Sequence, residues 1–500
     1  MPGSPLPSRN RRTTAAPTSE SVGPVDALSI VLQCVLAGVL VLLALLSAQL
    51  AALGFVRYFR EQPRLRTPNL PDEALPEVLV QLPVCDEGAL AVRVATAAAR
   101  LDWPQDKLRI QVLDDGHTAD HELLANTIRD AVPEGTPIDI LHRGERTGFK
   151  AGNLAFGLQH SDAPYVAIFD ADFVQPTDFL RRTIPPLMGD PGLAFMQARW
   201  GHANRGKNWL TRVQGVLLDA HFAVEQEGRI RAELPISFNG TAGVWRRAAI
   251  DNGGGWTGDT LTEDLDLSMR CALKGWRAGL LPDLEVPGEL PETAAGWRAQ
   301  QARWNKGHAQ CARKLLPQIW ASDFPMWKKL IVSFQICQFA FFALALASAV
   351  ISITLMAMGV VYIQSIAMLG LSVSALGLIC SLGYLYLGQV ILGRENAPYL
   401  ARTLVLGIVF PSGLILSNAR ATFEAFFGGK IDFTRTLRAG ERYVGGWRGG
   451  PELVAGVLLP IFAFAEQAWS APFFIFVVSG LVSMGAMGLS GSVPAPAHRD

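Results

Sequence analysis

The sequence contains few cysteines, and none of them is paired in a recognisable motif. Six occur in 500 residues, without a Cys-x-x-Cys pair or the spacing of a zinc site. Three lie in apolar segments, so we expect free thiols in a reducing compartment rather than a disulfide framework or a structural metal centre. These cysteines are Cys34, Cys85, Cys271, Cys311, Cys337 and Cys380.

The sequence also lacks an excess of either charge. Its 44 Lys and Arg residues balance its 44 Asp and Glu residues, which gives no reason to expect a nucleic-acid partner. Apolar residues, in contrast, make up 50% of the chain, and the mean hydropathy is +0.24. Because long stretches keep an ordinary charge density, the apolar residues must be concentrated in particular segments.

Changes in composition divide the chain into seven parts. Ala27 to Val56 contains no charged residue, which exceeds the ~20 residues that span a bilayer and is too long for a cleaved signal peptide. We expect a disordered tail at 1–25, a transmembrane helix at 26–56 and a cytosolic α/β domain at 57–329. Transmembrane or interfacial helices should follow at 330–419, and then a basic cytosolic segment with an interfacial helix and a loop at 420–450. Two more transmembrane helices, at 451–491, and a short tail, at 492–500, complete the expected order.

The part between Arg57 and Lys329 alternates short β-branched or apolar runs with helical stretches. This alternation predicts a mostly parallel, Rossmann-like sheet, whose ligands bind beyond the carboxyl ends of its strands. The expected helices include Ala89–Arg100 and Asp120–Val132. The expected strands are Val78–Leu82, Leu108–Leu113, Ile138–Leu141, Tyr165–Phe169 and Leu193–Ala198.

The apolar stretches after this domain predict a multi-pass membrane protein. No charge occurs between Lys329 and Arg394, which leaves room for two spans, and a shorter third stretch, Thr403–Asn418, contains Pro411. The basic segment that follows should be cytosolic, so an even number of crossings must precede it. We therefore expect Thr403–Asn418 to be interfacial or re-entrant, and the protein to lie in the inner (plasma) membrane with the α/β domain in the cytosol.

Two acidic clusters follow predicted strands. Asp114 and Asp115 come directly after one strand, where a carboxylate can accept hydrogen bonds from a nucleobase or ribose, although Asp-Asp-Gly is also a common turn. Asp170 and Asp172 close another strand, and two carboxylates at this spacing can share Mg²⁺ or Mn²⁺ bound to a diphosphate. The alternative for this second pair is a solvated turn.

A third cluster contains Glu263 and Asp264. One of these carboxylates could be the general base that removes a proton from an attacking hydroxyl. The alternative is a helix start: Thr262 is a suitable N-cap for a helix that runs from Glu263 to Lys274. Both can hold, because capping also fixes the direction of Asp264.

A fourth cluster presents Gln300, Arg303 and Trp304 on one short helical stretch. Arg can pair with a diphosphate, and Trp can stack on the apolar face of a sugar ring. The stretch could equally be an amphipathic helix on the membrane surface. Lys150, in a Gly-rich stretch, could add positive charge near a phosphate or be merely solvated.

These clusters, in this order, resemble the family-2 inverting glycosyltransferases with the D, D, D, QxxRW signature, which include cellulose, hyaluronan, chitin and mannan synthases. The matching segments are DDG at 114–116, GFKAGNL at 148–154, DAD at 170–172, FNGTAGVWRR at 238–247, TED at 262–264, QQARW at 300–304 and FTRT at 433–436. Among subgroups, the chain looks most like the cellulose-synthase-like A, or glucomannan synthase, branch and its bacterial relatives. One departure is Cys85-Asp86-Glu87, where the family usually has Tyr-Asn-Glu, which puts the contact with the base or ribose in doubt.

The resemblance implies a GT-A catalytic domain inserted between transmembrane helices. It implies that Asp264, with Glu263 beside it, serves catalysis and that Asp170 and Asp172 hold the metal. It assigns Phe238, Asn239, Gly240 and Trp304 to the acceptor. The residues that it assigns to the donor are Asp114, Asp115, Lys150, Asp170, Gln300, Arg303, Trp304, and Thr434 and Arg435 of a gating-like loop.

The function that the resemblance implies is processive polymerisation of a β-linked glucan, mannan or glucomannan from a nucleotide-sugar, UDP-glucose or GDP-mannose, with transfer of the growing glycan across the bilayer. A non-processive enzyme that adds one sugar to a lipid is the alternative, and a transporter or inactive scaffold is a second one. The residues leave open the donor sugar, the linkage, the product length and any envelope partner.

Overall fold

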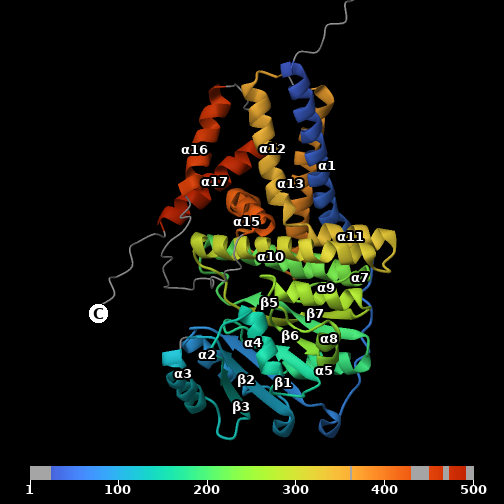
Figure 1. The fold of residues 1–500 in the computed structure, drawn as a ribbon, viewed down its shortest axis with the longest axis vertical. Helices are drawn as coiled ribbons and strands as arrows, with labels where there is room; N and C mark the ends of the chain where they lie inside the picture. The colour runs from blue at the N-terminus through green and yellow to red at the C-terminus, as the bar shows by residue number, and fades with distance from the viewer. Residues whose placement is uncertain (1–23, 117, 361–362, 429–449, 466–471, 491–500) are drawn as a thin grey trace, which may run out of the picture.

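The computed structural model describes residues 24–116, 118–360, 363–428, 450–465 and 472–490. An α/β domain forms one end of the molecule and a bundle of apolar helices the other, with α10 (Ala294–Ala321) and α11 (Met326–Ile336) lying across the junction (Figure 1). The tails expected at 1–25 and 492–500 lie outside the described residues, except for Pro24 and Val25.

The sheet of the α/β domain has seven strands in the order β3-β2-β1-β4-β6-β5-β7. All neighbouring pairs are parallel except those of β6, which runs antiparallel to both β4 and β5. The mostly parallel sheet and the five predicted strands are thereby confirmed. The strands are β1 (Val78–Val84), β2 (Leu108–Asp114), β3 (Ile138–His142), β4 (Tyr165–Ile168), β5 (Leu193–His202), β6 (Gly243–Arg246) and β7 (Arg277–Gly288).

Alternation along the central strand divides the core into two layers. Val78, Val80 and Leu82 of β1 are fully buried and pack in the layer that includes α2 and α5. Leu79, between them, is fully buried in the layer that includes α4, α8 and α9. A strand buried on both faces is mostly apolar, and every residue of β1 except Gln81 is apolar, which explains why β1 was readable from the sequence.

The helices of this domain follow the strands along most of the chain. The expected helices Ala89–Arg100, Asp120–Val132 and Glu263–Lys274 correspond to α2, α3 and α9 with small shifts at their ends. The helices are α2 (Ala89–Ala98), α3 (Thr118–Ala131), α4 (Phe149–Leu158), α5 (Phe179–Gly189), α6 (Trp209–Ala220), α7 (Glu227–Arg231), α8 (Arg247–Asn252) and α9 (Glu263–Leu273), with a π-helical segment, His221–Gln226, between α6 and α7.

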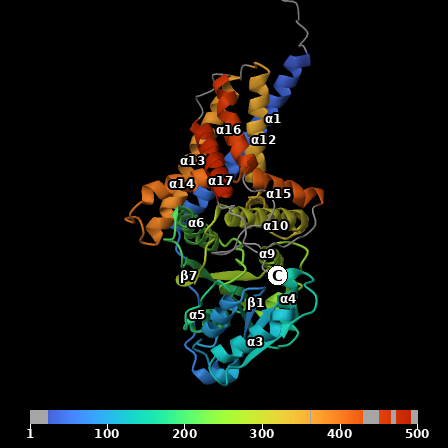
Figure 2. The same ribbon diagram turned by 90° about the vertical axis from the view of Figure 1, so that its left-hand side faces the viewer.

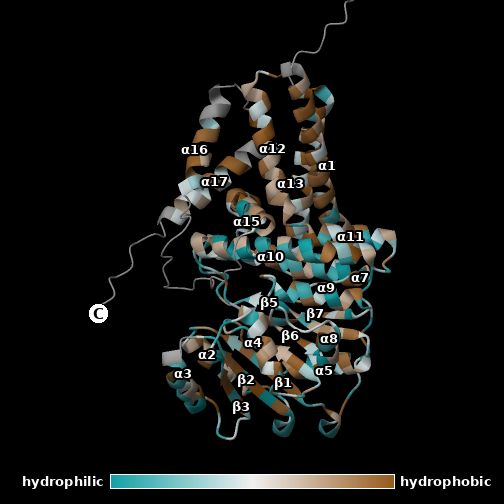
Figure 3. Ribbon diagram, in the orientation of Figure 1, coloured by the Kyte–Doolittle hydropathy of each residue, from teal (hydrophilic) through white to brown (hydrophobic). Residues whose placement is uncertain are grey.

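Three helices of the described chain are long and apolar enough to cross a membrane: Ala27–Phe59 within α1 (Pro24–Phe59), α12 (Ala340–Ala357) and α13 (Gln364–Ile391). Colouring by hydropathy separates this bundle from the more polar α/β domain (Figure 3). The third stretch forms α14 (Leu400–Ser412) and α15 (Ile415–Phe427), which meet at a 45° bend and make either a broken span or a re-entrant loop. The view in Figure 2 places α14 and α15 on opposite sides of the molecule, near the level of α10. Two further apolar helices, α16 (Gly450–Ala465) and α17 (Pro472–Ser490), complete the described bundle.

A buried carboxylate joins the two ends of the molecule. Asp219 of α6 is fully buried and forms an ion pair with Arg205 and another, of 2.9 Å, with Arg394 just beyond α13. Gln389 of α13 also donates to Asp219, at 3.1 Å. Because a buried charge needs its partners, this network holds the α/β domain against α13.

Candidate active site

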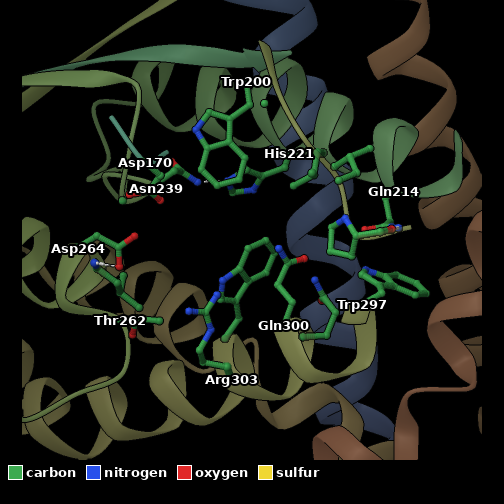
Figure 4. Close-up of a pocket in the computed structure, with 18 of the residues that line it drawn as sticks. Asp170, Trp200, Gln214, His221, Asn239, Thr262, Asp264, Trp297, Gln300 and Arg303 are labelled. Carbon is green, nitrogen blue, oxygen red and sulfur yellow. Dashed lines mark hydrogen bonds between the residues drawn. The ribbon is translucent and has the colours of Figure 1, made fainter. Parts of the chain in front are cut away.

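A cavity of about 690 Å³ lies between the carboxyl ends of the strands and α10. Figure 4 shows Asp170, Asp264 and Arg303 directed toward it from three different segments. On the side away from the sheet its lining comes from the apolar helices, with Leu46, Leu50, Phe341, Phe342, Tyr384 and Leu414. The cavity therefore joins the strand ends, where ligands of parallel sheets bind, to the helix bundle.

Lys150 and Asp170 meet in this cavity. Asp170 follows β4, and its backbone N–H donates to the hydroxyl of Thr241 at 2.9 Å. Lys150 donates to Asp170 Oδ1 at 2.5 Å and to the carbonyl of Gly240 at 2.9 Å. Burial opposes the charged form of Lys150, but the carboxylates of Asp170 and Glu263 outweigh it and raise its pKa. Lys150 is therefore a fixed cation among carboxylates, not a solvated side chain.

The carboxylates predicted to bind metal both line the cavity. Asp170 and Asp172, separated by one residue, follow the end of β4. Glu289, which follows β7, also lines the cavity. Lys150 donates to Oδ1 of Asp170, and Asp170 and Asp172 are the residues that would hold a metal ion. Hard divalent cations prefer oxygen ligands of this kind, so the donor set fits Mg²⁺ or Mn²⁺.

Asp264 and Glu263 begin α9 at the wall of the cavity. Burial raises the pKa of Asp264, despite a hydrogen bond of 2.8 Å from the Leu265 N–H and the charge of Lys150. Burial raises the pKa of Glu263 too, and the neighbouring carboxylate of Asp264 adds to the effect. A carboxylate with a raised pKa is a stronger base than an exposed one, as proton removal from a hydroxyl requires.

The predicted cap of α9 is wrong in one respect. Thr262 occupies the N-cap position, but its side chain makes no capping hydrogen bond. Its hydroxyl lies instead 3.3 Å from the sulfur of Cys311, on α10. Thr262 therefore links α9 to α10, because packing against the neighbouring helix takes its hydroxyl away from the helix end.

Gly240 leaves space for the carboxylate of Asp264. Its φ of +80° is one that residues with a side chain rarely adopt. A Cβ at this position would lie 3.1 Å from Asp264 Oδ2 and 3.5 Å from Lys150 Nζ. Gly240 thus sits beside the two charged groups and brings its backbone close to them.

The predicted cluster on α10 forms the opposite wall. Gln300, Arg303 and Trp304 all line the cavity, and the Trp304 ring lies 6.5 Å from that of Trp200, on β5. Burial lowers the pKa of Arg303, while the carboxylates of Glu263 and Asp170 act against this shift. The cavity-facing position of these side chains supports the binding interpretation, while α10 also lies across the junction with the apolar helices, as the amphipathic surface helix considered for this stretch would.

The two carboxylates at the end of β2, Asp114 and Asp115, differ in position. Asp114 does not line the cavity: its Oδ1 accepts from the Gly116 N–H and its Oδ2 lies 2.8 Å from His121 Nδ1. Asp115 does line it, but Arg143 binds both of its oxygens, at 2.6 and 2.7 Å. The expectation that either carboxylate is open to a nucleobase is thus corrected for Asp114 and restricted for Asp115.

Two histidines near Asp114 were not found from the sequence. His121 and His142 stack with ring centroids 4.6 Å apart, and with Asp114 they form the group of three in the described chain that could hold a metal ion. They lie on α3 and at the end of β3, and single histidines 21 residues apart give no ligand pattern in the sequence. The unusual Cys85 lines the cavity nearby, and burial raises the pKa of its thiol to about 11.

The residues predicted to bind the acceptor are brought together, but not all are open to it. Phe238 lines the cavity, but it is only 1% exposed and its ring packs edge-on against Phe195 and Trp245, so little of it is open to an acceptor. Asn239 faces the cavity, with its Nδ2 2.9 Å from Nε2 of His221.

His221 and Glu225 are further cavity residues that the sequence did not indicate. They lie on the π-helical segment and pair with each other, with 3.0 Å between Nδ1 and Oε2. A π-helical turn inserts one residue into the helical period, so no amphipathic pattern could have placed both of them inward. Thr434 and Arg435, predicted for the gating-like loop, lie outside the described residues.

Comparisons with known proteins agree with this geometry. Residues 165–387 match the family described as Glycosyl transferase family group 2. A probable glucomannan 4-beta-mannosyltransferase 9 of Oryza sativa subsp. japonica is 39% identical over 323 residues, which are 61% of this chain and 61% of that protein. Glucomannan 4-beta-mannosyltransferase 9 of Arabidopsis thaliana is 35% identical over 399 residues, 75% of this chain and 69% of that protein. The matched part thus spans less than two thirds of the rice relative's length.

A solved structure has the same fold. The mannosyltransferase PcManGT from Pyrobaculum calidifontis, in complex with GDP-Man and Mn²⁺, aligns with a TM-score of 0.52 at 20% identity, over 81% of this chain and all of that one. At this identity the likeness concerns the fold alone, and it confirms the predicted GT-A architecture.

Proposed function

Because the chain belongs to the group 2 family of glycosyl transferases, within the cellulose synthase superfamily, we propose that it is a membrane-embedded inverting glycosyltransferase that extends a β-linked mannan or glucomannan. The observation that carries this proposal is the shared cavity: Asp170, Asp264 and Arg303 face one space that continues between the apolar helices. A donor, an acceptor and an exit path can all meet there.

Asp264 is the general base in this proposal. It removes the proton from the acceptor hydroxyl, whose oxygen then attacks the anomeric carbon of the donor from the side opposite the leaving diphosphate. One such displacement turns an α-linked donor sugar into a β-linkage. Burial keeps Asp264 basic, and Gly240 leaves its Oδ2 accessible.

The leaving diphosphate is stabilised by fixed positive charge. Arg303 and Lys150 enter the cavity from opposite sides, and their charges are positioned before the reaction begins. Asp170 and Asp172 would hold Mg²⁺ or Mn²⁺. When bound, such a cation supplies further neutralisation of the departing phosphates.

The acceptor glycan lies against the α10 side of the cavity. Trp304 and Trp200 offer aromatic faces for sugar rings, and Asn239 and His221 offer hydrogen-bonding groups. Trp297 and Gln300 continue the lining toward the apolar helices (Figure 4). This continuity supports a growing chain that passes between the helices. The proposal keeps residues 57–329 in the cytosol and the protein in the plasma membrane.

The proposed donor is GDP-mannose. The rice and Arabidopsis relatives are named as glucomannan mannosyltransferases, and the Pyrobaculum structure contains GDP-Man. The base contact is the part of the site that differs from expectation, since Asp114 is turned away and Asp115 is bound by Arg143. UDP-glucose therefore stays in the test as the second donor.

The experiment that tests the proposal uses the purified protein in lipid vesicles with Mn²⁺ or Mg²⁺. Radiolabelled GDP-mannose, UDP-glucose and UDP-N-acetylglucosamine are offered in turn, and the product is digested with β-mannanase or β-glucanase. Incorporation from GDP-mannose into mannanase-sensitive product is expected. Incorporation from another donor alone would replace the proposed sugar, and incorporation from none would contradict the activity.

A further inference from the structure

A second cavity, of about 730 Å³, lies outside the candidate active site. It forms a groove between the end of α1, the turn after α7 and helix α11, which Figure 1 shows close together at the junction of the two ends of the molecule. Its walls are largely apolar, with Ala52, Leu53, Val56, Ile331 and Phe334. None of the active-site residues lines it.

The groove lies at the depth of lipid headgroups. The apolar part of α1 has 33 residues, about 50 Å of helix, against a hydrocarbon core of ~30 Å, so part of it extends beyond the core. Arg57, in its last turn, pairs with Glu227 of α7 at 2.6 Å, so the last turns are the part that lies beyond the core. Tyr58, Phe59 and Trp327, at this end, are 71%, 65% and 52% exposed. Exposed aromatic side chains at helix ends are typical of the membrane interface.

Two cations without carboxylate partners stand at this groove. Arg60 and Lys328 both line it, and neither forms an ion pair within the described part of the chain. Lys328 donates to the backbone carbonyl of Glu233 at 3.1 Å, and the Glu233 carboxylate, which also borders the groove, lies beyond ion-pair distance. The polar rim therefore has a positive charge that an anion would complement.

The length of the groove also limits the occupant. Its lining on α1 runs from Ala48 to Arg60, about 18 Å of helix, which is close to half of the ~30 Å hydrocarbon core plus a headgroup. A small anion would leave the apolar wall uncovered, and an acyl chain alone would leave the cations unpaired. One ligand that meets both demands has an anionic head and a long apolar tail.

We propose that this groove binds one glycerophospholipid with an anionic headgroup. Its phosphate lies at Arg60 and Lys328, and one acyl chain lies along Leu53 and Ile331 toward the bilayer. The proposal is independent of the sugar that the enzyme transfers. It makes the junction between α1 and α11 a lipid-binding part of the protein.

The test is native mass spectrometry of the full chain released from vesicles of phosphatidylglycerol or phosphatidylcholine. Wild type is expected to retain one phosphatidylglycerol. In the variant Arg60→Gln/Lys328→Gln the affinity of the protein for phosphatidylglycerol should fall about thirtyfold, because each cation near a membrane surface contributes roughly one order of magnitude or less. The matched control, Arg64→Gln/Lys329→Gln, removes the same charge from two residues outside the groove lining and should retain the lipid.

Two further variants test the position of the acyl chain. Ala52→Phe fills the apolar wall without changing charge and should displace the lipid. Gln49 lines the deep end, and its amide atoms are buried with no hydrogen-bond partner among the described residues, so Gln49→Leu should retain or tighten the lipid. Retention of phosphatidylcholine to the same extent as phosphatidylglycerol would overturn the proposal, as would Arg60→Gln/Lys328→Gln behaving like its control. Loss of binding in Gln49→Leu, or a second copy of the chain in the groove, would overturn it too.

Discussion

Replacement of Asp264 by Asn removes the proposed base while changing little else in the cavity. The Asn side-chain oxygen can still accept the hydrogen bond that Leu265 N–H donates at 2.8 Å, and the Lys150–Asp170 pair is untouched. A positioned general base contributes about 10²–10⁴-fold to rate, which corresponds to roughly 3–5 kcal/mol of barrier. We therefore expect the transfer rate to fall by at least a hundredfold and donor affinity to change by less than about threefold.

Stability provides an internal control for this variant. The raised pKa of Asp264 means that burial disfavours its charged form, so a neutral Asn should leave Tm unchanged or raise it. Asp251→Asn, which breaks only an exposed pair with Arg247, is the matched substitution outside the cavity and should retain full activity.

The assay measures label transfer from the donor at saturation and, separately, donor binding by calorimetry in the presence of Mn²⁺. Equal loss of binding and turnover in Asp264→Asn would place this carboxylate in donor binding and refute its role as the base. Full turnover would refute the assignment altogether.

Three other predictions concern the same cavity. Asp172→Asn should raise the Mn²⁺ concentration required for half-maximal transfer by about tenfold or more, because it removes one of two proposed carboxylate ligands; an unchanged metal titration would contradict the ligand assignment. Gly240→Ala should cost about 1–2 kcal/mol of stability because of its φ of +80°, and it should lower kcat about tenfold because the new Cβ presses on Asp264 Oδ2. A variant with wild-type kcat and Tm would show that the close approach of Gly240 to Asp264 is unimportant. The rate should fall as pH decreases through the raised pKa of Asp264, since the base must be deprotonated, so the acid limb of a kcat profile should lie above the usual range of an aspartic acid; an acid limb near pH 4 would be inconsistent with the buried base.

The parts of the fold that were predictable are those with local signals. β1 and β2 are mostly apolar because both faces of a central parallel strand are buried, although β1 contains Gln81 and β2 contains Arg109, Gln111 and Asp114. β6 has only four residues, and β7 contains two prolines and three charged residues, so neither produced a strand pattern. They become strands because pairing with β4 and β5 provides the hydrogen bonds that their own sequences do not favour.

The candidate site was predictable where a residue type and its spacing carry the chemistry. Asp170, Asp264 and Arg303 could be placed together because strand ends of one sheet share an edge. A sequence pattern does not determine where a side chain points. The pairing of Asp114 with His121 and the burial of the Phe238 ring could therefore not be predicted. His221 depended on a π-helical turn, which changes the helical period at one point only.

The size of the product tests the central claim most directly. The reconstituted protein is given GDP-mannose and Mn²⁺, and the labelled product is separated by gel filtration after extraction with organic solvent. A high-mass, solvent-insoluble and mannanase-sensitive product is the predicted result, because the cavity continues from Asp264 between the apolar helices. A low-mass product that extracts into the solvent would contradict polymer synthesis and make the protein a glycosyltransferase of lipid acceptors.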